Sequence, residues 1–203
     1  MTASVRRPPR GEYAKTAQRR LEIIGAAAAT FSESGFRDGS LRDVAQRVGI
    51  THAGIRHHFP TKVDLLMAVL EWRDEEALGR ARANHPVGVG VLRAWIDSTR
   101  RNANTPMLVD LELTLTAEAT SPDHPAYLYF RDRYARANEI LVRAFKAIAK
   151  EGQLAKSLSP ESAARLFLSA TLGLQTLWLK DRSVDVSGEL TRQARLLLSV
   201  AFE

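Results

Sequence analysis

The chain has 203 residues, of which 45% are hydrophobic and 26% charged, and it contains no cysteine. This composition is typical of a soluble globular protein with one or two small domains. The lack of cysteine excludes disulfides, thiolate nucleophiles and iron–sulfur clusters, and it favours a reducing cytoplasm. The longest weakly charged apolar stretch, residues 166–179, is too short to span a bilayer. We therefore expect neither a membrane anchor nor a signal peptide.

The positive charge is concentrated at the start of the chain. Residues 1–62 contain 11 Lys or Arg and 5 Asp or Glu, which accounts for the whole net charge of +6, and they hold three of the five histidines. A segment with this balance is expected to face a polyanion. A membrane surface is the weaker candidate because the segment has no bulky apolar face to insert. The expected partner is nucleic acid.

Apolar residues recur with helical period along the chain, and runs typical of β-strands are nearly absent. This pattern predicts an all-α protein of about nine helices. The first helix is expected at about residues 16–34 and ends at Gly35, which can adopt a left-handed conformation. Ser40, with Asp43 three residues later, is expected to cap a second short helix, and Thr51 to cap a third that ends near His58.

Two short helices joined by a turn at Gly49 predict a helix-turn-helix. A helical hairpin with no role in DNA binding would have the same spacing. The surface of the second helix favours the DNA-binding interpretation, because its small and cationic residues fall on one arc while Ile55 points to the opposite side. The members of this arc are His52, Ala53, Arg56 and His57.

Residues 20–66 resemble the DNA-binding domain of TetR-family transcriptional regulators. The resemblance rests on the joint spacing of Ala27, Phe31, Gly35-Phe36, Val44-Ala45, Gly49-Ile50-Thr51, His58-Phe59, Lys62 and Leu65. It implies an all-α homodimer of roughly 200 residues. It further implies a variable second domain with a small-molecule pocket, and repression more often than activation. The chain departs from the family pattern at Arg56, where most members carry an aromatic residue, typically Tyr.

The resemblance also implies roles for individual residues in DNA binding. It assigns Thr51, His58 and Lys62 to phosphates, Arg42 to a phosphate or a base edge, and His52, Ala53, Arg56 and His57 to the major groove. Thr51 and Lys62 lie at predicted helix N-termini, where free backbone N–H groups favour anions. For Thr61 we expect simple helix capping. The basic segment at residues 6–10 either reaches DNA or is a solvated tail.

The histidines do not have the spacing of a metal site. His52 and His57 are five residues apart and His57 and His58 are adjacent, so no pair has the i, i+4 spacing that directs two imidazoles at one ion. We expect no metal and no cofactor.

The domain boundary is expected near residue 60, with a DNA-binding domain at 1–60 and a helical ligand-binding and dimerisation domain at 61–203. A glycine-containing segment at residues 87–90 predicts a hinge, and the last helix is expected at about 187–202. The helix near residues 160–180 is apolar around most of its circumference, which favours a symmetric dimer interface over a central helix of a monomer. The expected interface residues are Leu166, Ala170, Gly173, Leu177, Leu197 and Val200.

A pocket for a small-molecule effector of unknown identity is expected among the middle helices. The candidate lining residues are Trp95, Met107, Leu111, Leu115, Tyr127, Phe130 and Tyr134. Simple packing is the stronger explanation, because an aromatic stripe at helical spacing usually forms a core, and no buried charge indicates the chemistry of a ligand there.

Two other functions were weighed against ligand-responsive regulation. An enzyme is disfavoured because there is no phosphate-binding loop or nucleophile elbow, and the run Asp74-Glu75-Glu76 is interpreted as a solvated helix face. An architectural DNA-binding protein would share the first domain but would need no effector pocket. The sequence does not specify the operator, the effector or the regulated genes.

Overall fold

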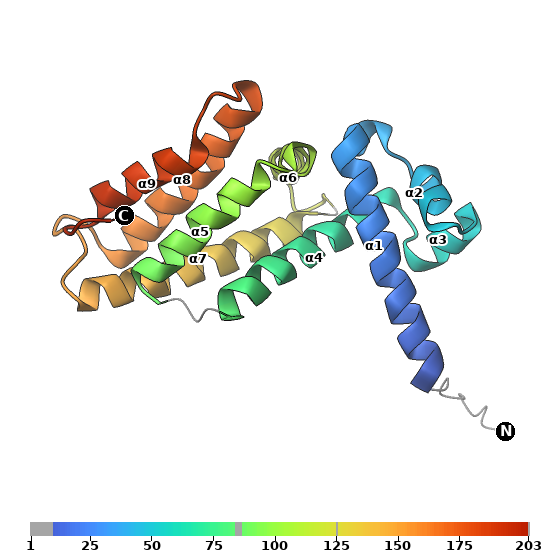
Figure 1. Ribbon diagram of the computed structural model, residues 1–203, viewed down its shortest axis with the longest axis horizontal. Coiled ribbons are helices and arrows are strands. Elements are labelled where there is room, and N and C mark those ends of the chain that lie inside the picture. Colours follow the sequence, from blue (N-terminus) through green and yellow to red (C-terminus); the bar gives the residue numbers. More distant parts are fainter. Residues whose placement is uncertain (1–9, 84–86, 125, 203) are drawn as a thin grey trace. The chain divides into compact units, whose positions relative to one another are not determined.

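The computed structural model describes residues 10–83, 87–124 and 126–202, and these residues form nine α-helices (Figure 1). No β-strand occurs within these ranges, although an isolated antiparallel bridge joins Leu154 and Leu198. The all-α prediction is confirmed. The helices are α1 (Arg10–Asp38), α2 (Leu41–Val48), α3 (His52–His58), α4 (Lys62–Ala83), α5 (Val89–Asn102), α6 (Pro106–Glu118), α7 (Tyr127–Lys150), α8 (Pro160–Lys180) and α9 (Val186–Leu197).

The chain divides into two compact units, Met1–Trp72 and Arg73–Glu203. The division falls within α4, later than the boundary that the sequence suggested near residue 60. The first part of α4 therefore belongs to the unit that contains the helix-turn-helix. The predicted basic arm at residues 6–10 lies almost entirely outside the described residues.

In the first unit, α1 supplies one apolar face to the core. Ile23, Ala27 and Phe31 are fully buried, as are Val44 of α2 and Ile55 of α3, and α1 packs against α2. The helix is longer than predicted, because helical structure resumes after a kink at Gly35, which has φ 76°. The positive φ expected at this glycine is present, but with ψ 170° the residue is not in the left-handed helical conformation that ends a helix, and it bends the helix instead.

Capping interactions delimit the two short helices. The hydroxyl of Ser40 accepts a hydrogen bond from the backbone N–H of Asp43, and the Asp43 carboxylate accepts from the backbone N–H and hydroxyl of Ser40. This reciprocal pair is the capping box that the sequence predicted. Gly49 adopts φ 73° at the end of α2, and the N–H of Ile50 donates to the carbonyl of Ala45. The glycine thus permits the turn that leads into α3.

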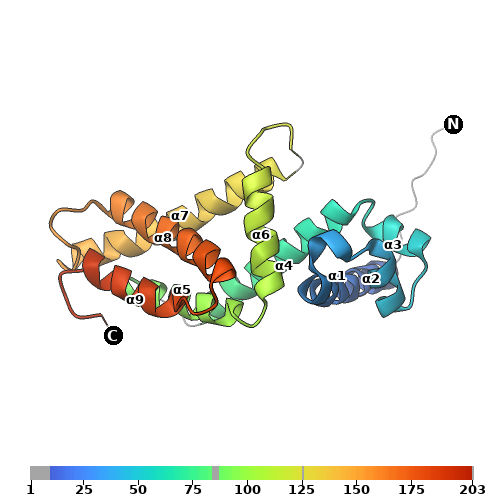
Figure 2. The same ribbon diagram turned by 90° about the horizontal axis from the view of Figure 1, so that it is seen from above.

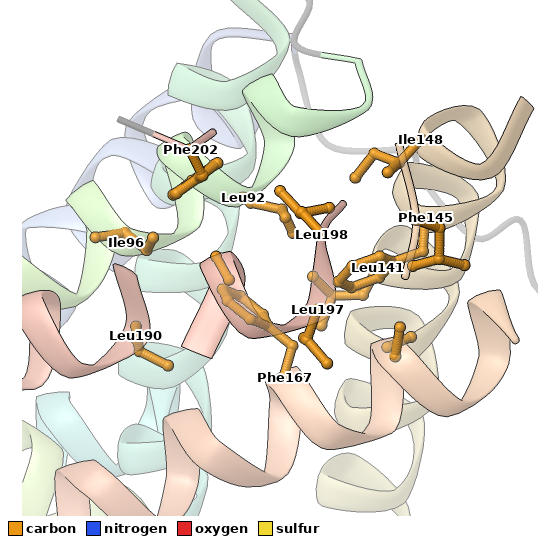
Figure 3. Packing of buried hydrophobic residues seen from close by; sticks show 14 residues of the cluster. Leu92, Ile96, Leu141, Phe145, Ile148, Phe167, Leu190, Leu197, Leu198 and Phe202 are labelled. Atoms are coloured by element: carbon orange, nitrogen blue, oxygen red, sulfur yellow. The ribbon is translucent and has the colours of Figure 1, made fainter. Parts of the chain in front are cut away.

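The second unit has its own hydrophobic core, formed mainly by α5, α7, α8 and α9. Helix α8 packs against α7 on one side and α9 on the other (Figure 1), while α6 crosses the direction of α7 and α8 (Figure 2). Phe145 and Phe167 meet edge to face at the centre of this core. Figure 3 shows the surrounding apolar side chains, which include Leu92, Ile96, Leu141, Ile148, Leu190, Leu197, Leu198 and Phe202.

The last helix is shorter than the sequence predicted. It ends at Leu197, and the chain then continues in an extended conformation in which Leu198 pairs with Leu154. The side chain of Phe202 is buried in the same core, and its carbonyl accepts a hydrogen bond from Nε of Arg195. Leu198 and Phe202 of this non-helical segment pack inward, whereas the residues between them are exposed.

A cluster of charged side chains joins α4, α6 and α7 within the second unit. Nε and Nη2 of Arg133 donate to the two carboxylate oxygens of Asp74 at 2.7 and 3.0 Å, and Nη1 donates to Glu112. Burial lowers the pKa of Arg133, but attraction to Glu112 and the bonds to Asp74 outweigh it and hold the pKa well above its ordinary value. The interpretation of Asp74 as part of a solvated face is wrong, and the second unit does contain buried charge.

We expect Arg133→Ala to lower the free energy of unfolding by about 3 kcal/mol, because it leaves two carboxylates without their partner in a poorly hydrated place. Urea unfolding followed by circular dichroism measures this change. The control is Arg131→Ala on the same helix. Arg131 forms an ion pair with Asp132, and the two side chains are 56% and 50% exposed to solvent. The control should leave the unfolding midpoint unchanged. Equal effects of the two substitutions would contradict a structural role for the cluster.

Candidate nucleic-acid interface

Helix α3 presents one solvent-exposed face of small and cationic side chains. His52, Ala53, Arg56 and His57 are exposed, whereas Ile55 is fully buried on the opposite side of the helix. The face is therefore the one that the sequence indicated. A helix with such a face fits the geometry of the major groove, where side chains read the edges of bases.

Groups suited to phosphate lie at the N-terminal ends of the neighbouring helices. The hydroxyl oxygen of Thr51 accepts a hydrogen bond from the N–H of Gly54 at 3.0 Å, which leaves its own hydrogen available to donate. Arg42 is exposed in the first turn of α2. Lys62 is the half-buried first residue of α4, and burial lowers its pKa against the attraction of Asp38 and Asp43. Each position adds a donor where backbone N–H groups already favour an anion.

Thr61 acts as a helix cap. Its hydroxyl accepts from the N–H of Asp64, and its own N–H donates to the Asp64 carboxylate. This is the role that the sequence predicted for it, and it fixes the start of α4 beside Lys62.

Arg20 of α1 holds the C-terminal end of α3 in place. Its Nη1 donates to the carbonyl of His58 at 2.9 Å, and its guanidinium lies 4.1 Å from the centre of the Phe59 ring. Burial, with repulsion from His57 and Arg20, lowers the pKa of His58. His58 is therefore suited to meet a phosphate as a neutral N–H donor. Sequence reasoning missed the role of Arg20, because the contact spans 38 residues.

The acidic side chains of this unit are largely occupied by internal partners. Glu22 pairs with Arg19 and Glu33 with Arg47, while Asp43 and Asp64 cap helices. By contrast, Arg42 and Arg56 form no ion pair with any residue that the structure describes. The exposed cations near α3 are therefore available to an external anion.

The residues expected to line an effector pocket lie on α5, α6 and α7. Leu111, Leu115 and Phe130 are buried, and Trp95 donates a hydrogen bond to Thr171. The hydroxyls of Tyr134 and Thr116 are hydrogen-bonded at 2.8 Å, and burial raises the pKa of Tyr134. Met107 and Tyr127 are half-buried. The assignment of these residues to a ligand stays a prediction.

A cavity of about 190 Å³ lies elsewhere in the second unit, and none of those seven residues lines it. It is enclosed by the C-terminal end of α5, by Val109 of α6, by the last turns of α8 and by the segment that leads into α9. Its lining residues are Thr99, Arg100, Asn102, Ala103, Val109, Gln175, Trp178, Val184, Asp185, Val186 and Ser187. Sequence reasoning missed it because its walls come from four separate segments.

The residues proposed for dimerisation divide into two groups. Leu166, Ala170, Gly173 and Leu177 share one face of α8, on which Leu166 and Leu177 are 44% and 57% exposed. Val200 is 41% exposed, in the segment after α9. Leu197, in contrast, is only 3% exposed and lies in the core of its own subunit, whereas its neighbour Leu196 is 75% exposed. The assignment of Leu197 to a surface therefore does not fit its burial.

The described residues were also compared with the requirements of a membrane span and of a metal site. None of the helices in the described ranges is long and apolar enough to cross a membrane. Among the same residues, no three His, Asp or Glu side chains lie close enough together to hold a metal ion.

Comparisons with known proteins agree with this geometry. A model of bacterial regulatory proteins of the tetR family matches residues 23–69, which include α2, α3 and parts of α1 and α4. The transcriptional repressor KstR2 of Rhodococcus jostii is 24% identical over 182 residues, which cover 85% of each chain.

Solved structures share the fold of the whole chain. A TetR transcription regulator from Haloarcula marismortui superposes with a TM-score of 0.76 at 20% identity, over 90% of this chain and all of that one. A transcriptional regulator from Saccharomonospora viridis, solved in complex with choline, superposes with a TM-score of 0.71 at 18% identity, over 91% of this chain and 100% of that one. These relatives are regulators, which argues against the enzyme alternative. The helix-turn-helix, its exposed cationic face and these similarities together identify residues 23–69 as a DNA-binding domain of the TetR family, in a chain that has the fold of TetR-family regulators.

Proposed function

We propose that the protein is a homodimeric repressor that binds a pseudo-palindromic DNA operator and is released from it by a small molecule. The observation that carries this proposal is the exposed face of α3, formed by His52, Ala53, Arg56 and His57. In the complex, this face enters the major groove, while Thr51, His58, Lys62 and Arg42 engage the DNA backbone on either side. The side chain of Arg42 is also long enough to reach the edge of a base.

The exposed face of α8 supports the dimer. Leu166, Ala170, Gly173 and Leu177 follow one another at helical spacing, and no heavy atom lies within 4 Å of the position that a Cβ on Gly173 would occupy. A second helix can therefore approach closely at that point. Pairing this face with its copy removes apolar surface from water and generates the two-fold axis that a pseudo-palindromic operator requires. Leu196 and Val200 extend the apolar surface beyond α8.

The effector response is supported by the second unit and by a structural relative. The regulator from Saccharomonospora viridis was solved with choline bound, and it shares the fold of this chain. The second unit of this chain contains a cavity and a buried charge cluster, and α4 runs from this unit into the helix-turn-helix unit. A ligand that favours one position of α4 would change the affinity for DNA through linkage.

The first expected result is strongly salt-dependent DNA binding. Each phosphate neutralised by a cationic side chain releases about 0.9 of a counterion, so log K should fall linearly with log[KCl]. Fluorescence anisotropy between about 50 and 200 mM KCl measures this slope, with a duplex enriched from a random library and a scrambled duplex as the control. An affinity that does not respond to salt, or enrichment of no sequence at all, would overturn the proposal.

The second expected result concerns base reading by Arg56. Its guanidinium is a rigid fork that suits O6 and N7 of guanine. Arg56→Ala should weaken binding to the enriched duplex by about 1–3 kcal/mol and relax preference at one base pair per half-site, with little loss on random DNA. Arg47→Ala is the control, because Arg47 pairs with Glu33 at 2.6 Å. Equal loss on both duplexes, with a smaller salt slope, would assign Arg56 to a phosphate instead.

The third expected result concerns the oligomeric state. Leu177→Glu places a charge in the proposed interface and should convert the dimer to a monomer in sedimentation-velocity experiments. Leu128→Glu is the matched control, because Leu128 on α7 is exposed to the same extent, 57%, but lies outside the proposed interface. A wild-type monomer at micromolar concentration, or a dimer that survives Leu177→Glu, would count against this interface.

A further inference from the structure

The cavity of about 190 Å³ combines an apolar wall with a few polar groups. Ala103, Val109, Val184 and Val186 supply aliphatic surface, and Trp178 supplies an aromatic ring. An engineered apolar cavity of about 150 Å³ is large enough to hold benzene. This cavity therefore has room for one six-membered ring with a small substituent, and it is too small for a drug-sized molecule.

Gln175 is the unusual member of the wall. It is only 7% exposed, it lines the cavity, and its side-chain amide forms no hydrogen bond with any residue that the structure describes. The fully buried side-chain atoms without a partner in the described residues are Nη1 of Arg73 and Oδ1 of Asn138, so the amide of Gln175 keeps access to the cavity that it lines. A ligand in the cavity can therefore supply hydrogen bonds that the protein does not.

Two further polar groups of the wall can take part. The hydroxyl of Thr99 donates to the carbonyl of Ile96 at 2.7 Å, which leaves its oxygen able to accept another bond. Oδ1 of Asn102 accepts from Nη2 of Arg73 at 3.1 Å. A ligand with both donor and acceptor character therefore has partners of both kinds along this part of the wall.

The charged side chains of the wall already have partners within the protein. Arg100 forms an ion pair with Asp97 at 3.0 Å, and the carboxylate of Asp185 caps α9 by accepting from the N–H of Gly188 and the hydroxyl of Ser187. A cationic ligand would have to compete for a carboxylate that already caps a helix. An anionic ligand would lose its hydration and meet an arginine that already has a counter-ion, so the lining favours an uncharged ligand.

We propose that this cavity binds an uncharged single-ring molecule that carries one hydroxyl, carbonyl or amide group. Its polar group bonds to the amide of Gln175, and its ring packs against Trp178 and the neighbouring valines. The site differs from the set of residues that the sequence suggested, and it gives the proposed effector response a chemical class of ligand.

Asn102 links the cavity to α4. Among the described residues, Oδ1 of Asn102 is the only acceptor for the Arg73 guanidinium, and Nη1 of Arg73 is buried without a partner. Arg73 is the first residue of the second unit, at the point in α4 where the first unit ends. A ligand that shifts Asn102 would remove the acceptor from a largely buried cation, so Arg73 and α4 would have to adjust. This effect on DNA rests on the proposed function, whereas binding to the cavity does not.

The test uses titration calorimetry of the full-length protein with named probes. Phenol and benzamide should bind with one site per chain, at least tenfold more tightly than benzoate or benzylamine, which are charged at neutral pH. Gln175→Leu keeps the volume of the side chain but removes the amide. It should weaken phenol and benzamide about tenfold, since the polar group of the ligand then lacks its partner. Toluene, which has no polar group, should bind both proteins within a factor of three.

Gln193→Leu on α9 is the matched control, because Gln193 does not line the cavity, and it should bind all probes like the wild type. The melting temperature of Gln175→Leu should not fall, since the amide that is removed forms no hydrogen bond with the described residues; if this variant fails to fold, Gln175→Met replaces it. Loss of probe binding in Gln175→Leu alone supports the site. Absence of binding in the wild type, or equal binding of phenol by Gln175→Leu and wild type, overturns it.

The effect on DNA is read separately by anisotropy with the enriched duplex. Saturating phenol or benzamide should change the dissociation constant for DNA at least threefold in the wild type and by less than that in Gln175→Leu at the same probe concentration. Probe binding without this change overturns the link through Asn102 and leaves the site in place. A protein that binds the probes but no DNA overturns the proposed function and not the ligand site.

Discussion

The second half of the molecule depends on a buried guanidinium held between two carboxylates. Arg133 donates to Asp74 of α4 and to Glu112 of α6, so one side chain of α7 fixes two other helices. Charges in such a place are stable only when their partners stay within hydrogen-bond distance, which makes this junction intolerant of small displacements. Within the second unit, this cluster therefore joins α4, α6 and α7.

The presentation of α3 rests on a different set of contacts, all within the first unit. Capping at Ser40 and Thr51 sets where α2 and α3 begin, and Gly49 allows the turn between them. Arg20 then ties the end of α3 to α1 through a hydrogen bond to a carbonyl and a contact with the Phe59 ring. These contacts use the backbone and buried side of α3. They leave its outer face, which includes Arg56, exposed to solvent.

The proposed ligand site does not include the aromatic residues of α5 and α7. Phe130 stacks with Tyr134, the hydroxyl of Tyr134 is hydrogen-bonded to Thr116, and Trp95 donates to Thr171. The side chain of Gln175 forms no hydrogen bond with the described residues, and it lies where helix ends and a connecting segment leave space unfilled. A polar side chain that lines a cavity and forms no hydrogen bond within the protein indicates a ligand site better than a group of aromatic residues does. Aromatic residues at helical spacing usually form a hydrophobic core.

The sequence by itself determined the helical class, the helix-turn-helix, the caps at Ser40, Thr51 and Thr61, and the exposed arc of α3. These features depend on residues a few positions apart, where periodicity and capping chemistry act locally. Only the tertiary structure decided the partners of Arg20, Asp74 and Arg133, the inward position of Leu197 and the site of the cavity. Each of these depends on segments far apart in the chain, so their contacts follow from packing that no local pattern encodes. A carboxylate such as Asp74 reads as solvated until the fold brings an arginine 59 residues away to meet it.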